Sequence, residues 1–161
     1  MKSKQSWDRF YMDFALEVAQ LSYAPDRKVG AVAVSKKGVM AFSYNGTVPG
    51  SSNATIDSEG ITLPCVLHAE TSAMAKLNKE TSTEGAWLYS TLSPCMDCAK
   101  AVYQAGILRV VYLEEYKHGN AALMFLNSNG VECKQLYETK ELPHARLFTK
   151  EQLKGTVYEY E

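Results

Sequence analysis

Apolar side chains at the start of the chain recur at intervals of three and four residues. Within SWDRFYMDFALEVAQLS the recurring positions are Trp7, Phe10, Tyr11, Phe14, Val18 and Leu21. This spacing is typical of one face of an amphipathic helix, and Ser6 is a suitable N-cap for it. The pattern therefore predicts a first helix with an aromatic-rich apolar face.

Two short β-rich runs flank SKKG in the segment KVGAVAVSKKGVMAFSYNG. They predict a β-hairpin in which Gly38 supplies the turn. The chain then changes character over residues 46–64, GTVPGSSNATIDSEGITLP, which is rich in Gly, Ser, Thr and Pro. About twenty residues without periodicity is long for a purely structural connection. This favours a functional loop or lid over the alternative of a mobile surface loop.

Helical and strand patterns alternate in the second half of the chain. HAETSAMAKLNKE, PCMDCAKAVYQAG and NAALMFLNSNG predict helices, whereas GAWLYSTL, ILRVVYL and VECKQL predict strands. Pro94 suits the first turn of the second of these helices, and Gly106 suits its end. The run ILRVVYL has almost no polar position, so we expect this strand to be buried on both faces. Helical crossovers between strands imply right-handed parallel pairing.

Together with the hairpin, these elements predict an α/β fold in which helices flank a five-stranded mixed sheet. A chain of 161 residues suits one domain. We expect its core over about residues 6–136 and a C-terminal tail over residues 137–161. The tail ends in HARLFTKEQLKGTVYEYE, which is expected to form a last helix or an arm.

Composition and charge exclude several classes of protein. The net charge of −1 provides no excess of Lys and Arg for gripping a long nucleic acid, although one or two local cations suffice for a small anionic ligand. No segment approaches the roughly 18 apolar residues of a membrane span. The N-terminal stretch MKSKQSWDRF lacks the apolar region of a signal peptide. We therefore expect a cytoplasmic protein, in a compartment where disulfides are rare.

Two cysteines, Cys95 and Cys98, lie three residues apart at the predicted start of a helix, where they share a face. The positive end of the helix dipole favours the thiolate that a metal needs. His68 also begins a predicted helix, and helices that follow neighbouring strands begin at the same edge of a sheet. Three such ligands leave a fourth tetrahedral position for water, which is typical of a catalytic zinc.

Glu70 lies two residues beyond His68, so it points away from the ligand direction but can stand beside the open position. There it can take a proton from the zinc-bound water and pass it to a leaving group. Two alternatives stay open from the residues alone. Cys65 or Cys133 can close the site as a fourth, structural ligand, and the C-x-x-C pair can instead be redox-active.

The order His68-Ala69-Glu70 and then, after a strand, Pro94-Cys95-x-x-Cys98 is the signature of zinc-dependent nucleobase deaminases. Further segments resemble the deoxycytidylate (dCMP) deaminases in order and spacing: KVGAVAV, SYNGTVPG, LHAETSAM, EGAWLYSTLSPCMDCAKAVYQAGILRVVYLEEY and NSNGVECKQL. The likeness runs from about residue 10 to residue 136. It implies a three-layer αβα fold of the cytidine-deaminase type. It also implies a hydrolase that converts dCMP to dUMP and ammonia and so feeds dTMP synthesis.

For the metal, the resemblance implies that His68, Cys95 and Cys98 hold one catalytic Zn²⁺ per chain, with Glu70 as the proton carrier. Family members often have extra Cys and His ligands for a second zinc in the segment before the His-x-Glu motif. Residues 46–64 contain neither residue type. We therefore expect a single zinc ion.

For the pyrimidine and its sugar, the resemblance implies four further positions. The Ala69 backbone N–H would hold the pyrimidine O2, and the Ser93 backbone carbonyl would take the exocyclic amine. Asn45 matches an asparagine that contacts the sugar, and its alternative role is that of a turn residue. Tyr116 matches an aromatic residue near the base and sugar, and its alternative role is packing.

A nucleotide also needs a cation for its 5′-phosphate. Arg27 and Lys28 precede the first strand, in the position of a family loop near the active site, and are the candidates. The family's glycine-rich loop after YNG often takes part in activation by dCTP and inhibition by dTTP, with Mg²⁺ bound to the effector. Here TVPGSSN departs from the usual pattern, so allosteric control stays open. Many family members are hexamers, and the aromatic first helix can serve such an interface, which favours a homo-oligomer.

Other functions also fit these motifs. One is deamination of another substrate: a different cytosine nucleotide or nucleoside, guanine, a riboflavin precursor, or a base in tRNA or single-stranded DNA. The near-neutral charge weighs against the polymers. A third reading is a zinc-stabilised binding module without catalysis. Turnover of a substrate panel distinguishes these functions, because zinc content alone fits all of them.

Overall fold

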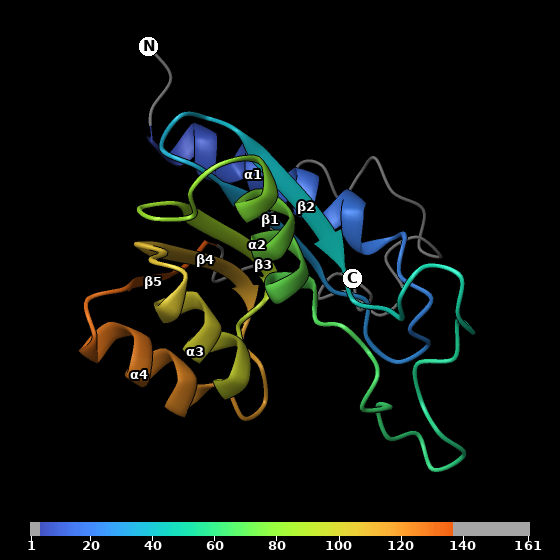
Figure 1. Ribbon diagram of the computed structural model, residues 1–161. Coiled ribbons are helices and arrows are strands. Elements are labelled where there is room, and N and C mark those ends of the chain that lie inside the picture. The colour runs from blue at the N-terminus through green and yellow to red at the C-terminus, as the bar shows by residue number, and fades with distance from the viewer. Residues whose placement is uncertain (1–3, 137–161) are drawn as a thin grey trace.

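The computed structural model describes residues 4–136, with side chains from residue 7 onward, as four helices and five strands (Figure 1). In chain order they are α1 (Lys4–Ala19), β1 (Gly30–Val34), β2 (Met40–Tyr44), α2 (Ala69–Glu80), β3 (Trp87–Leu92), α3 (Met96–Gln104), β4 (Arg109–Glu114), α4 (Asn120–Ser128) and β5 (Glu132–Gln135). The prediction for the tail after residue 136 lies outside the described residues. Within the described part, no helix has the length and apolar character needed to cross a membrane.

The strands form one mixed sheet in the order β2-β1-β3-β4-β5. β1 pairs antiparallel with both β2 and β3, whereas β3, β4 and β5 pair in parallel. The β1–β2 hairpin turns at Gly38, whose φ of 80° is favourable for glycine. β4 lies between two partners and is buried along almost its whole length, as its continuous apolar run predicts. The predicted five-stranded mixed sheet is therefore confirmed.

Helices cover both faces of the sheet and complete the three predicted layers (Figure 1). On one face, α1 covers the sheet and forms an apolar cluster with three strands. Its buried members are Met12, Ala15, Leu16, Val32, Tyr89, Val111 and Leu113. On the other face, α2, α3 and α4 cover the alternate strand positions, among them Ala31, Leu88 and Val110. This division follows from the two-residue period of a strand, which sends successive side chains to opposite faces.

The face of α1 that meets the sheet differs from the aromatic face predicted by spacing. Trp7 and Phe10 are 46% and 52% exposed, whereas Ala15 and Ala19 are fully buried. The physical reason is a close backbone approach, because a Cβ on Gly30 of β1 would overlap the carbonyl oxygen of Ala15 and lie 2.6 Å from the Ala19 nitrogen. A helix this close to a strand presents small residues to it. Trp7 and Phe10 therefore lie outside the contact with the sheet, whereas Tyr11 and Phe14 pack against the buried cluster and Val18 is buried. The predicted apolar face is confirmed for these last three residues and wrong for Trp7 and Phe10.

Two helices also begin at residues other than those predicted. α1 begins at Lys4, so Ser6 lies inside the helix instead of capping it. α3 begins at Met96 with Cys95 as its N-cap, so Pro94 precedes the helix. Gly106 follows the end of α3 with a φ of 76°, as predicted. The consequence for the site is that Cys95 lies at the positive end of α3.

Candidate metal centre and its pocket

The candidate metal ligands come from the starts of α2 and α3. We expected these helices to follow neighbouring strands, but β1 lies between β2 and β3. Because β2 and β3 are both antiparallel to β1, they run in the same direction and end at the same edge of the sheet. His68 is the N-cap of α2 and Cys95 the N-cap of α3, and neither side chain makes a capping hydrogen bond. Both side chains are thus available to a ligand at this edge.

The predicted ligands His68, Cys95 and Cys98 converge. The Nδ1 atom of His68 lies 3.2 Å from Sγ of Cys98 and 3.6 Å from Sγ of Cys95. The three donor atoms all lie within 4.8 Å of one another. One imidazole nitrogen and two thiolates at this spacing fit zinc, which prefers these ligand types in a tetrahedral arrangement.

The two remaining cysteines lie outside this group. Cys65 is free and exposed, and the Cys133 thiol is directed to the carbonyl of Val131 at 3.8 Å. The group that the structure brings together within residues 4–136 therefore has three ligands. This favours the open, three-ligand site over the closed structural site that the sequence left as an alternative.

Hydrogen bonds link the three candidate ligands and shift their pKa values. Hydrogen bonds with Cys98 and His68 lower the pKa of Cys95 to about 3. The hydrogen bond to Cys95, together with burial, raises the pKa of Cys98, and the hydrogen bond with Cys95 raises the pKa of His68. A cation that binds here needs both thiols deprotonated. Metal binding is therefore expected to release protons and to strengthen as the pH rises.

Glu70 stands beside the three ligands without joining them. It is 5% exposed, and burial raises the pKa of its carboxyl group. One oxygen accepts a hydrogen bond from the Ser90 hydroxyl at 3.4 Å, and the other faces the Cys98 thiol at 3.8 Å. A buried carboxyl group next to the ligands is suited to proton transfer. The contribution of Ser90 was not predicted, because in the sequence it is one of several small residues in a strand.

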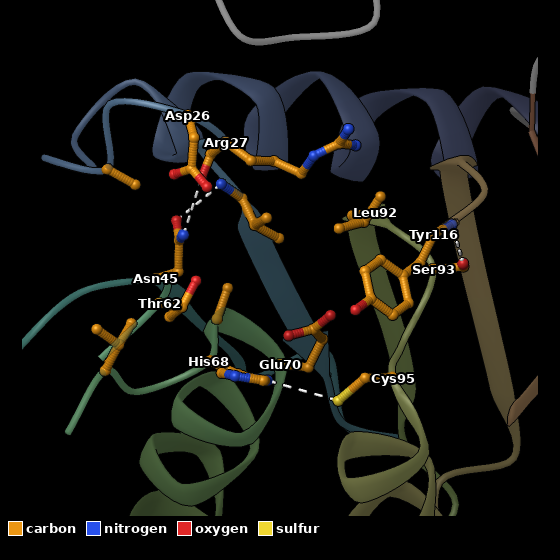
Figure 2. Close-up of a pocket in the computed structure, with 14 residues that line it drawn as sticks. Asp26, Arg27, Asn45, Thr62, His68, Glu70, Leu92, Ser93, Cys95 and Tyr116 are labelled. Atoms are coloured by element: carbon orange, nitrogen blue, oxygen red, sulfur yellow. Dashed lines mark hydrogen bonds between the residues drawn. The ribbon is translucent and has the colours of Figure 1, made fainter. Parts of the chain in front are cut away.

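A cavity of about 390 Å³ opens beside the candidate metal centre (Figure 2). The predicted site residues that line it are Arg27, Asn45, His68, Ala69, Glu70, Ser93, Cys95 and Tyr116. Four lining residues that sequence reasoning missed matter for its shape and charge, namely Asp26, Thr62, Val66 and Leu92. Thr62 belongs to the long connection over residues 46–64, and Val66 follows that connection closely. That connection was predicted to be functional, and its unusual length was the signal that could have identified these residues.

Asn45 lines the cavity, but its side chain is largely occupied by the backbone. Its Oδ1 accepts the N–H of Val29 at 2.8 Å, and its Nδ2 donates to the carbonyl of Arg27 at 2.9 Å. The residue therefore braces the segment that leads into β1. One of its two amide hydrogens remains for a ligand.

The two candidate cations differ in position. Arg27 lines the cavity and extends across its top in Figure 2, where its Nη1 pairs with Oε1 of Glu114 at 2.9 Å. Lys28 is not among the lining residues, so its prediction as a binding residue is not supported.

The chain matches known proteins over most of its length. The family model for the cytidine and deoxycytidylate deaminase zinc-binding region matches residues 5–114. The deoxycytidylate deaminase of Saccharomyces cerevisiae is 30% identical over 147 residues, which cover 86% of this chain and 47% of the yeast protein. The human deoxycytidylate deaminase is 32% identical over 137 residues, which cover 78% of this chain and 76% of the human protein.

A solved structure resembles the fold as well. It is the crystal structure of dCMP deaminase from the cyanophage S-TIM5 in complex with dCMP and dUMP. The TM-score is 0.77 at 37% sequence identity, and the match covers 83% of this chain and all of the phage chain.

Fold, metal-ligand geometry and family model together define a class. The chain belongs to the cytidine and deoxycytidylate deaminase zinc-binding family. Deoxycytidylate deaminases are the relatives that it resembles within that class. The chain spans about half the length of the two fungal relatives, at 47% and 44%.

Proposed function

We propose that this protein is a zinc-dependent deaminase that converts dCMP and water to dUMP and ammonia. The observation that carries the proposal is the convergence of His68, Cys95 and Cys98, with the buried carboxyl of Glu70 in the same cavity. The likeness to the cyanophage enzyme supports dCMP as the substrate, because the match covers the whole of that chain.

His68, Cys95 and Cys98 hold one zinc ion. When bound, the ion lowers the pKa of a coordinated water and so supplies a nucleophile near neutral pH. Glu70 moves the protons. It passes the first proton of the water to N3 as the new bond to C4 forms, and the second to the amine, which leaves as ammonia when the C4–N bond breaks. Burial raises the pKa of Glu70, which favours the protonated form that a proton carrier must pass through.

The rest of the cavity orients the nucleotide. Ala69 lies at the N-terminus of α2, where unpaired backbone N–H groups suit the pyrimidine O2. The Ser93 carbonyl takes the amine, and Tyr116 bounds the base and sugar. Arg27 binds the 5′-phosphate, because a phosphate dianion is a stronger partner for a guanidinium than the partly exposed carboxylate of Glu114.

Further partners belong to the same proposal. We expect a cytoplasmic homo-oligomer, with a hexamer favoured, and dCTP with Mg²⁺ and dTTP as candidate effectors. Exposed rings on α1 and β2 support an interface: Phe42 is 42% exposed, and it lies beside Phe14 at a centroid distance of 5.1 Å. Analytical ultracentrifugation with and without the effectors tests both expectations.

The decisive experiment is ammonia release from dCMP, dCTP, deoxycytidine and cytidine, measured with the zinc-loaded protein. We expect turnover of dCMP to exceed that of the nucleosides. Equal activity on cytidine would remove the nucleotide from the proposal. Absence of turnover on every substrate, with zinc bound, would instead indicate a binding module.

A further inference from the structure

The segment that joins β4 to α4 brings Tyr116 to the wall of the cavity. It covers residues 115–119, and Gly119 is the N-cap of α4. The Gly119 N–H donates to the carbonyl of Tyr116 at 2.7 Å, which closes a tight turn. The hydrogen bond within this turn uses the Tyr116 carbonyl. The Tyr116 N–H is not part of that bond and has its partner outside the turn.

Ser93 provides that partner. Its hydroxyl is the acceptor of the Tyr116 N–H at 2.6 Å, and its own N–H donates to the carbonyl of Glu114 at 2.8 Å. Ser93 is 1% exposed and lies two residues before the candidate ligand Cys95. Figure 2 shows the Tyr116 ring pointing into the pocket toward Glu70, on the side of the residue away from the Ser93 contact. Two hydrogen bonds thus connect Ser93 with this part of the chain, one to the last residue of β4 and one to the residue that carries the ring.

The space around the Ser93 hydroxyl is closely filled. A Cβ on Gly119 would lie 2.8 Å from Ser93 Oγ and 3.0 Å from the carbonyl oxygen of Tyr116. The φ of Gly119 is −84°, which any residue can adopt. Glycine is therefore needed here for space and not for backbone conformation. The absence of a side chain lets the turn approach Ser93 closely enough for the 2.6 Å hydrogen bond.

We propose that the Ser93 hydroxyl is a positioning group that fixes Tyr116 against the cavity and thereby sets the affinity for the nucleotide. The proposal rests on the proposed function for the identity of the ligand. It assigns the hydroxyl of Ser93 a role separate from that of its carbonyl. Without the hydroxyl, the partly buried N–H of Tyr116 loses its partner, and the turn is free to move.

The first test needs no ligand. In the zinc-loaded protein, hydrogen exchange of the Tyr116 amide is compared between the wild type and Ser93→Ala. A net hydrogen bond is worth about 1 kcal/mol, so we expect exchange to become about fivefold faster. Ser35→Ala is the matched control, because the Ser35 hydroxyl also accepts backbone N–H groups, in the distant β1–β2 turn. An unchanged exchange rate in Ser93→Ala would overturn the proposal.

The second test is a double-mutant cycle on dCMP. We expect Ser93→Ala to raise the KM about fivefold with little change in kcat. In a Tyr116→Ala background it should have no further effect on KM, because the ring that it positions is absent. If the serine were purely structural, Ser93→Ala would lower the Tm in both backgrounds, and its effect on KM would be the same with and without the Tyr116 ring. That result would overturn the proposal. Wild-type protein that turns over no nucleotide would refute the proposed function, and the exchange measurement would still decide the anchoring of Tyr116.

Should Ser93→Ala fail to fold, Gly119→Ala provides a second variant, because its added methyl group would displace the same hydroxyl. Its added Cβ would lie within 2.8 Å of Ser93 Oγ. We expect it to speed exchange of the Tyr116 amide and to raise KM with kcat retained. An effect on kcat alone would contradict the proposed positioning role.

Discussion

Two clusters of ionisable groups lie in different parts of this protein, and they differ in burial and in how their charges are paired. One is the group of His68, Cys95, Cys98 and Glu70 at the edge where β2 and β3 end. The other, under α1, is centred on Asp8 and Arg109, which are 0% and 2% exposed. The guanidinium binds the carboxylate through two nitrogens, at 2.7 and 2.9 Å.

The cluster under α1 is internally balanced. The Tyr89 hydroxyl donates to Asp8 at 2.8 Å, and Lys134 reaches the same carboxylate at 3.3 Å. Glu132 pairs with Arg109 at 3.3 Å, and the Trp87 ring lies 4.7 Å from the guanidinium. Each charge therefore has an opposite charge from another element. Such a cluster holds α1, β4 and β5 together.

The cluster at the sheet edge consists of side chains that commonly bind metals, and its His68 side chain is exposed. Two thiols, an imidazole and a carboxyl group face one another, and they share protons where a metal would bind. The comparison indicates that the paired ions under α1 serve stability, whereas the set of imidazole and thiol ligands at the sheet edge suits a bound ion and its chemistry.

Cys98→Ser should have the largest effect of the substitutions that test this comparison, because it removes a candidate zinc ligand. Serine is a poor zinc ligand, and a metal that binds only the folded protein stabilises the fold. We expect loss of both zinc and turnover, together with reduced stability, measured by metal analysis and thermal unfolding. Cys133→Ser is the control and should retain one zinc per chain. Tight zinc binding by Cys98→Ser would show that the ligand set is wrong.

Glu70→Gln separates chemistry from metal binding. The amide keeps the shape of the side chain but cannot carry the proton, so turnover should fall by about 10²- to 10⁴-fold. Zinc content and fold should stay unchanged, because Glu70 is not one of the ligands. Ammonia release and metal analysis on the same sample provide both measurements. An active variant would refute the proton-carrier role, and Glu80→Gln at the end of α2 is the matched control.

Asp8→Asn breaks the internally balanced cluster. Removing one partner of a buried pair costs about 3–5 kcal/mol, and Glu132 compensates Arg109 in part, so we expect about 3 kcal/mol in urea unfolding. Zinc content and kcat should not change. Arg9→Gln is the control, because its pair with Asp13 is partly exposed at 4.0 Å and is worth less than about 1 kcal/mol. A loss of zinc in Asp8→Asn would mean that the two clusters are coupled.

The pH dependence of the free energy of unfolding also tests the contribution of Asp8. Burial raises the pKa of Asp8, but hydrogen bonds from Arg109 and Tyr89 outweigh it, so the pKa lies below 3.8 in the folded state. A carboxyl group with a lowered pKa stabilises the fold above its unfolded value and loses that contribution as the pH falls through the folded value. The stability difference between wild type and Asp8→Asn should therefore be constant near neutral pH and shrink below about pH 4. A difference that is unchanged in acid would contradict this account.

Among the four substitutions that test this comparison, Arg27→Gln should give the smallest effect. Loss of a charge-assisted hydrogen bond to phosphate is expected to raise the KM for dCMP about tenfold and to leave deoxycytidine unaffected. Stability should change little, because the ion pair with Glu114 is partly exposed. Lys28→Gln is the comparison, since Lys28 does not line the cavity. Equal effects of Arg27→Gln on the nucleotide and the nucleoside would remove Arg27 as the phosphate partner.

The elements most accurately predicted from sequence were those with strong local patterns. The continuous apolar run over β4 predicted a strand buried on both faces, and Gly38 and Gly106 marked a turn and a helix end. The ligand set was also predictable, since His68 and the Cys95–Cys98 pair have a specific spacing at the starts of helices. Lys28 was predicted as a binding residue from its charge and its place beside Arg27, and the sequence alone does not tell which of the two lines the cavity.

Local periodicity by itself determined the order of helices and strands, because it depends on residues that are close in the chain. The His-x-Glu and Pro-Cys-x-x-Cys motifs marked the three candidate zinc ligands, although His68 and Cys98 are 30 residues apart. Only the tertiary structure decided which face of α1 is buried, since that follows from the contact between Gly30 and the α1 backbone. It also decided the partners of buried charges. Asp8 and Arg109 are 101 residues apart, and no pattern along the chain says that they meet. Pairing of that kind depends on how elements pack, which is a property of the folded molecule.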